Sequence, residues 1–318
     1  MSSLPRREFL AGVAAMTAAT VGSRFTFAQS SSPFRVSVIN DEISQDFGHV
    51  CEVAAKEFGM RWMELRGMWN KNIVALDDKE VAEARRLLDR FNLKVTDIAS
   101  PLFKVDWPGA PKSKYSESKS FNASFTLNEQ DEVLERAIAM AKAFGTDRVR
   151  CFDFWRLEDQ TPYRDAINGK LRDAAAKAEK KGIILVLENE PACNTATAQE
   201  AVKVLGAVQS KSFMLNWDPG NAAASGEIPY PNGYNLLPKD RIGHCHCKDV
   251  VKKDGKFDWA PMGGGIIDWA GQFRALKRDG YHLATSLETH WKGAGSQEDS
   301  SRQSWAGMKK LLQEAQAL

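Results

Sequence analysis

Four residues in the second half of the chain have side chains that commonly bind divalent metals. Glu188, Asp218, His246 and Glu288 each stand at or just after the end of a short apolar run. Three carboxylates and one imidazole suit Mn²⁺ or Mg²⁺, with Zn²⁺, Co²⁺ and Fe²⁺ as alternatives. Any one of them alone could be an ordinary surface side chain. The four together predict a site for one divalent metal, with Mn²⁺ as the first expectation.

Further charged and imidazole side chains follow the same kind of apolar run. They are Glu64, Arg66, Arg156, Glu190, His244, Lys248 and His290. Unpaired charges are costly to bury, so charges that repeatedly follow buried segments need a shared purpose. A bound metal ion would provide one.

The segment from His244 to Cys247 alternates imidazoles with thiols. Side chains two positions apart on a strand point to the same side, so His244 and His246 face one way and Cys245 and Cys247 the other. His246 is the expected ligand. His244 lies one layer deeper, where it either orients a ligand or is a hydrogen-bonded core histidine. The two cysteines are expected to pack against helices, which disfavours a zinc site built on this run.

Eight short, mostly apolar runs predict strands that are buried on both faces, as in a parallel sheet. They are Phe34–Ile39, Trp62–Leu65, Lys94–Ala99, Arg148–Phe152, Ile183–Leu187, Phe213–Asn216, Ile242–His246 and Leu283–Leu287. Helical patterns follow at 50–58, 79–91, 129–144, 163–181, 196–208, 269–278 and 301–317.

This alternation predicts one α/β domain, a (β/α)8 TIM barrel over residues 31–318. In such a barrel the carboxyl ends of all strands meet at one mouth, which would bring the charged side chains together. The alternative, an open doubly wound sheet, normally has a glycine-rich loop after its first strand. Residues 40–44 read Asn-Asp-Glu-Ile-Ser and contain no glycine.

Residues 1–30 have the layout of an export signal. Arg6 and Arg7 precede Phe9 and Leu10, a modestly apolar run follows, and a cleavage site is predicted after Ala28. This pattern is typical of a twin-arginine signal, which exports folded proteins to the periplasm or the exterior. A general secretory signal or an uncleaved anchor is the alternative. No later apolar run is long enough to span a membrane.

The composition excludes some partners. The formal net charge is only +2, from 43 basic and 41 acidic residues, which provides no positive field for nucleic acid or an anionic membrane. The 5 cysteines cannot all pair within one chain and are predicted to be free or buried thiols. Free thiols fit a protein that is exported already folded.

Seven segments, in order along the chain, resemble those of a known enzyme family. They are VINDEISQDF (38–47), EFGMRWMELRG (57–67), VRCFDFWR (149–156), ILVLENEP (184–191), LNWDPGN (215–221), IGHCHCKDV (242–250) and TSLETHW (285–291). The chain resembles the xylose isomerase-like TIM barrels, specifically the sugar phosphate isomerase/epimerase group related to AP endonuclease family 2. The resemblance covers residues 34–315.

The resemblance implies that one metal is held by the four residues named first. It also implies that Glu188 and Glu288 act as acid and base, moving a proton next to a carbonyl through an enediolate. The expected substrate-binding residues are Glu64, Arg66, Arg156, Glu190, His244, Lys248, His290 and Trp291. Trp155 and Trp217 also flank strand ends, where an aromatic ring suits the C–H face of a sugar. Because sugar phosphates are mostly intracellular, an exported member is expected to act on a free or oxidised sugar.

Two positions depart from the family pattern. Residues 261–265 read Pro-Met-Gly-Gly-Gly where the group often has Gly-Glu-Gly, and Asn221 stands where some relatives have a second histidine. The multi-metal cluster of the AP endonucleases is therefore incomplete, which disfavours a nuclease.

Two other functions stay open. One is a lyase or hydrolase that acts on keto-glycosides through the same first step. The other is a non-catalytic sugar-binding protein. Relatives are often dimers or tetramers, so a homo-oligomer is a further expectation.

Overall fold

The computed structural model describes residues 32–116 and 125–318. The predicted export signal, residues 1–30, lies outside the described residues. Within the described chain, no helix is both long enough and apolar enough to cross a membrane.

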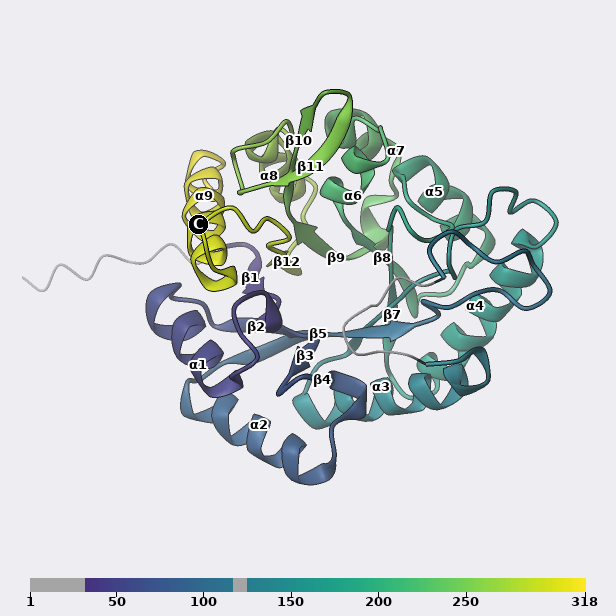
Figure 1. The fold of residues 1–318 in the computed structure, drawn as a ribbon, viewed down its shortest axis with the longest axis horizontal. Helices are drawn as coiled ribbons and strands as arrows, with labels where there is room; N and C mark the ends of the chain where they lie inside the picture. The colour runs from purple at the N-terminus through teal and green to yellow at the C-terminus, as the bar shows by residue number, and fades with distance from the viewer. Residues whose placement is uncertain (1–31, 117–124) are drawn as a thin grey trace, which may run out of the picture. The chain divides into compact units, whose positions relative to one another are not determined.

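Eight parallel strands form the central sheet, which curls into a barrel (Figure 1). They are β1 (Arg35–Val38), β2 (Trp62–Leu65), β5 (Lys94–Leu102), β6 (Arg148–Cys151), β7 (Ile184–Glu188), β8 (Phe213–Trp217), β9 (Ile242–Cys247) and β12 (Ala284–Leu287). The order β1-β12-β9-β8-β7-β6-β5-β2 runs once around the barrel, and a parallel bridge between Ile39 and Glu64 closes it. The predicted (β/α)8 barrel is confirmed.

Helices surround the strands (Figure 1). They are α1 (Phe47–Glu52), which a wider turn at Val53–Glu57 extends, α2 (Asp78–Arg90), α3 (Gln130–Phe144), α4 (Arg164–Glu179), α5 (Ala198–Ala207), α6 (Pro219–Ala224), α7 (Tyr234–Leu236), α8 (Trp269–Arg278) and α9 (Gln297–Glu314). Their ends follow local chemistry. Capping boxes begin α2 at Asp77 and α5 at Thr197, and α3 ends at Gly145, whose φ of 71° is left-handed.

Two hairpins are additions that the strand prediction did not include. One joins β3 (Gly67–Met68) to β4 (Lys71–Asn72). The other joins β10 (Asp249–Lys253) to β11 (Lys256–Ala260) directly after β9. Asp254 and Gly255 at its tip have φ values of 50° and 78°, as a type I′ turn requires. This second hairpin therefore begins where β9 delivers its polar side chains to the barrel mouth.

The apolar core lies between the strands and the helices. Cys245, Cys247 and Trp217 are buried in it, and the Trp217 indole N–H donates to Gln272 Oε1 at 3.1 Å. Trp217 thus packs in the core and is not part of an exposed sugar-binding face. All five cysteines are free and buried, as predicted.

Candidate metal centre

Four charged side chains from four strand ends meet inside the barrel mouth, and we call them the central cluster. Glu188 ends β7, Asp218 follows β8, His246 lies in β9 and Glu288 follows β12. Each is at most 2% exposed. Asp218 is also the N-cap of α6, where its Oδ1 accepts the Asn221 backbone N–H at 2.8 Å, so its other oxygen is left for the centre. The parallel strand order brings these residues together, as the sequence predicted.

The donor atoms of the central cluster are spaced like the ligands of a metal ion. His246 Nδ1 lies 3.5 Å from Glu188 Oε1, 3.6 Å from Asp218 Oδ2 and 3.3 Å from Glu288 Oε2. All four atoms lie within 4.8 Å of one another. Ligands about 2.1 Å from a metal are about 3.0 Å apart in octahedral geometry and about 3.4 Å apart in tetrahedral geometry. His246 Nδ1 is buried and has no hydrogen-bond partner among the described residues. The residues therefore fit a divalent metal.

Two arginines hold the outer oxygens of the two glutamates, whereas Lys248 contacts two of the oxygens that face the centre. Arg150 Nη1 donates to Glu188 Oε2 at 3.0 Å, and Arg66 Nη1 donates to Glu288 Oε1 at 2.8 Å. Lys248 Nζ lies 2.8 Å from Asp218 Oδ2 and also donates to Glu288 Oε2. Each glutamate therefore turns one oxygen toward the centre and gives the other to an arginine.

The electrostatics keep the cluster charged. Burial alone would raise the pKa of Glu188, but Arg150 and His246 outweigh it and lower that pKa to about 2. Burial alone would lower the pKa of His246, but Glu64, Glu288 and Glu188 raise it well above its ordinary value. Both Glu188 and His246 are thus charged at neutral pH, and the proton on His246 Nδ1 is the one that a divalent metal would replace.

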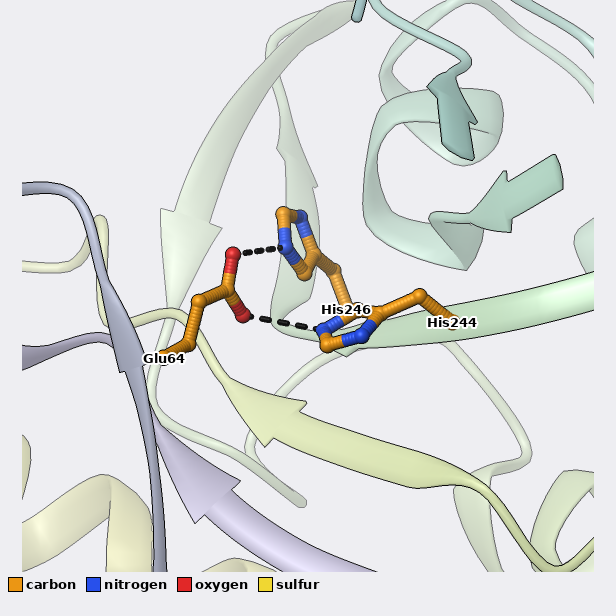
Figure 2. Close-up of side chains that lie close together, drawn as sticks. All are labelled: Glu64, His244 and His246. Atoms are coloured by element: carbon orange, nitrogen blue, oxygen red, sulfur yellow. Dashed lines mark hydrogen bonds and ion pairs between the residues drawn. The ribbon is translucent and has the colours of Figure 1, made fainter. Parts of the chain in front are cut away.

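Glu64 faces the two imidazoles of β9 and directs one carboxylate oxygen at each (Figure 2). It contacts His246 at Nε2, whereas the central carboxylates face Nδ1. Glu64 Oε1 is 3.0 Å from His246 Nε2 and its Oε2 is 3.0 Å from His244 Nε2. All three side chains are fully buried. His244 is therefore a buried, hydrogen-bonded histidine that shares a carboxylate with the candidate ligand His246.

The other predicted substrate-binding residues lie at different distances from the central cluster. Arg66 is buried and also binds Asp41 and Glu42. His290 Nε2 is 3.4 Å from Glu288 Oε1, so it borders the cluster. Glu190 pairs with Lys104 at 3.2 Å. Trp291 is only partly buried, and its ring packs against Gly293.

A second charged group lies beside the barrel mouth, and we call it the peripheral cluster: Asp153, Arg156, Arg164 and Glu200. Arg156 Nη2 donates to Glu200 Oε1 at 2.7 Å, and Arg164 Nη1 donates to Asp153 Oδ2 at 2.8 Å. Surface cavities of 680 and 460 Å³ border this cluster, and no central-cluster residue lines either of them. We nevertheless place the chemistry at the central cluster, because four donor atoms converge there within 4.8 Å of one another, whereas no such group among the described residues includes a residue of the peripheral cluster.

Three residues near the central cluster were missed by the strand-end pattern. Arg150 and Asp97 lie within strands, where an alternation of charged and apolar side chains is the only signal. Trp259 lies on β11, with its ring centroid 5.0 Å from Lys248 Nζ and 5.0 Å from the His290 ring. The Asp-Gly pair at 254–255 was the signal that could have revealed its hairpin.

Sequence comparison identifies the family. Residues 53–311 match the family model described as xylose isomerase-like TIM barrel. The chain belongs to this family. L-ribulose-5-phosphate 3-epimerase UlaE from Escherichia coli K12 is 24% identical over 155 residues, which are 47% of this chain and 52% of the epimerase. UlaE from strain ATCC 8739 is 26% identical over 157 residues. The chain thus spans about half the length of the curated relatives that it matches.

Solved structures share the fold. The crystal structure of IOLI protein with a binding zinc atom has a TM-score of 0.68 at 16% identity and covers 89% of this chain and 99% of its own. A xylose isomerase-like TIM barrel protein from Mycobacterium smegmatis in complex with magnesium has a TM-score of 0.61 at 16% identity, covering 89% and 98%. A D-tagatose 3-epimerase-like protein has a TM-score of 0.65 at 18% identity, with the same coverage. At these identities the likeness concerns the fold alone.

Proposed function

We propose that the protein is a metal-dependent sugar isomerase or epimerase with one divalent metal in the central cluster. The observation that carries this proposal is the convergence of Glu188, Asp218, His246 and Glu288 donor atoms at ligand spacing. Mn²⁺ is the first candidate, and Mg²⁺, Zn²⁺, Co²⁺ and Fe²⁺ are alternatives. The bound metal would polarise a substrate carbonyl.

Glu188 and Glu288 are proposed to move the proton. Both stay ionised at neutral pH, because Arg150 and His246 lower the pKa of Glu188, and Lys248, His290 and His246 lower the pKa of Glu288, against the opposing effect of burial. One carboxylate takes the proton from the carbon next to the carbonyl, forming an enediolate, and later releases that proton to solvent. The other, ionised at the start, takes up a proton from solvent and delivers it to the opposite face of the same carbon, which gives an epimer. Delivery to the former carbonyl carbon, with the hydroxyl proton passing between the two oxygens, gives an isomer. The arginines on the outer oxygens of the two glutamates fix the direction in which the inner oxygens point.

A sugar ring would contact the aromatic side chain of Trp259. This ring lies beside Lys248 and His290, which border the cluster and can bind hydroxyl groups. It comes from the hairpin that directly follows β9, so the strand that carries His246 also positions the hairpin. The C–H face of a sugar suits such a ring, which supports a sugar as the substrate class.

The loops after β9 and β12 favour an unphosphorylated sugar. TIM barrels frequently bind phosphate at the loops after their seventh and eighth strands. Here Asp249 already accepts the backbone N–H groups of Gly263 and Gly265 at 3.1 Å and of Ile267 at 3.3 Å, so an internal carboxylate takes these donors. The first turn of α9 carries Glu298 and Asp299, which would repel a phosphate. A free or oxidised sugar is also what export by the predicted twin-arginine signal, to the periplasm or the exterior, would favour.

Proton exchange tests the proposal. The purified protein, loaded with Mn²⁺, is incubated in D₂O with free sugars, oxidised sugars and keto-glycosides, and NMR follows deuterium entry next to the carbonyl. We expect exchange with formation of an isomer. Exchange with glycoside cleavage would favour the lyase or hydrolase alternative. Ligand binding without any exchange would contradict the enzyme proposal and favour a sugar-binding protein.

A further inference from the structure

We propose that Glu64 is a positioning residue that keeps the proton of His246 on Nε2 and so presents Nδ1 to the metal. This inference rests on the proposed metal site. Glu64 was expected to bind the substrate, and this inference gives it the role of supporting the metal ligand His246 instead. The relevant side chains are Glu64, His244 and His246, shown together in Figure 2.

The two nitrogens of His246 face different groups. Nε2 lies 3.0 Å from Glu64 Oε1, whereas Nδ1 faces the three carboxylates at 3.3 to 3.6 Å. A carboxylate accepts a hydrogen bond only from the protonated nitrogen, so it favours the tautomer with hydrogen on Nε2. That tautomer leaves the Nδ1 lone pair free to bind a metal. Metal-binding histidines generally have their second nitrogen fixed in this way.

His244 completes the arrangement by holding the other oxygen of the same carboxylate. Glu64 Oε2 is 3.0 Å from His244 Nε2, and neither side chain is exposed. The two imidazoles lie nearly at right angles, with ring centroids 5.4 Å apart. With both oxygens engaged, the carboxylate cannot rotate without losing one bond, so Oε1 stays directed at His246. Asn216 Nδ2 lies 3.1 Å from His246 Nε2, while Asn216 Oδ1 has no hydrogen-bond partner among the described residues. With hydrogen on Nε2, the amide would turn so that its oxygen accepts from that nitrogen.

A second cation among Glu64, His244 and His246 is the competing interpretation of the same residues, whose ligand atoms also lie within 4.8 Å of one another. Both nitrogen–oxygen distances are 3.0 Å, which is the length of a hydrogen bond. A cation there would also require His246 to bind metals through both nitrogens. The geometry therefore points to hydrogen bonds.

The test compares metal affinity among full-length variants by competition between Mn²⁺ or Zn²⁺ and a chelating dye. Replacing a supporting residue of this kind typically weakens metal binding about 10–100-fold, and we expect this for Glu64→Gln. Asp153→Asn is the matched control, because Asp153 is also a fully buried carboxylate but bonds Arg164 and Thr195. The control should lose stability while keeping the metal affinity of the wild type.

Two further measurements separate positioning from folding. Side-chain ¹⁵N NMR of the metal-loaded wild type should show His246 with hydrogen on Nε2, and Glu64→Gln should lose this signature. His244→Gln changes only the contact between residue 244 and Glu64 Oε2. A several-fold loss of metal affinity is therefore expected in this variant, which provides a test even if Glu64→Gln fails to fold. Unchanged affinity in a folded Glu64→Gln protein would overturn the inference, as would two ions per wild-type chain. A wild type that binds no metal would instead overturn the proposed function.

Discussion

The central and peripheral clusters are both groups of buried or half-buried charges near strand ends, yet their bonding differs. In the peripheral cluster, Asp153 accepts bonds from Arg164 and from the Thr195 N–H and hydroxyl, so both of its oxygens are satisfied. In the central cluster, His246 Nδ1 faces three carboxylates and has no hydrogen-bond partner in the described part of the chain. The peripheral charges neutralise one another, whereas the central donors point at a common position.

This difference explains why the larger cavities are a poor guide to the chemistry. They border the peripheral cluster, whose charged groups are already paired. A metal site needs donor atoms that converge on one position, and the central cluster has them, including His246 Nδ1, which has no hydrogen-bond partner among the described residues. Substitutions in the central cluster should therefore reduce activity, whereas those in the peripheral cluster should reduce stability.

The largest effect is expected for Glu288→Gln in the central cluster. The amide cannot exchange protons as a carboxylate does, so turnover should fall by about 10³-fold or more. Turnover is measured with saturating metal, so that weaker metal binding does not obscure the loss. Glu200→Gln is the control and should retain the turnover of the wild type. Unchanged turnover in Glu288→Gln would remove this residue from the proposed acid/base pair.

A smaller effect is expected for Trp259→Ala. Loss of one aromatic contact with a sugar should raise KM about 10-fold, which corresponds to about 1.4 kcal/mol of binding, with metal affinity unchanged. Phe257→Ala, on the same hairpin, is the control because Phe257 lies beside Lys252 rather than Lys248. An equal KM for wild type and Trp259→Ala would show that the substrate does not reach the hairpin.

The smallest effect should come from Glu200→Gln and should concern stability alone. Burial by itself would raise the pKa of Glu200, but Arg156 and the backbone N–H groups of Ala196 and Thr197 lower it below 4.5. A carboxylate whose pKa is lower in the folded than in the unfolded state stabilises the fold when it is ionised. This stabilisation is lost as the pH falls through the pKa of the folded state. We expect Glu200→Gln to lose about 1–2 kcal/mol of unfolding free energy at neutral pH.

The pH dependence provides the check on this prediction. The difference between wild type and Glu200→Gln, measured by urea unfolding, should be largest at neutral pH and should shrink as the pH falls through the lowered pKa of the wild-type carboxylate. A difference that stays constant with pH would mean that the Arg156–Glu200 ion pair adds no stability.

The sequence predicted the barrel and the central cluster well because both follow from strand ends. Apolar runs such as Ile184–Glu188 mark buried strands, and parallel order then brings their last residues together. Arg150 and Asp97 were not predicted, because a charged residue within a strand resembles one on an exposed face until its neighbours are known. The partner of Glu64 could not be predicted either, since β2 and β9 meet across the barrel and not along the chain.

The most direct test of the central claim is metal analysis of the purified protein beside a Glu188→Ala variant. We predict about one divalent ion per wild-type chain and its loss in the variant, because Glu188 Oε1 is one of the four converging donor atoms. Absence of metal from both proteins, even after reconstitution with Mn²⁺, Mg²⁺ and Zn²⁺, would contradict a metal centre and with it the proposed isomerase.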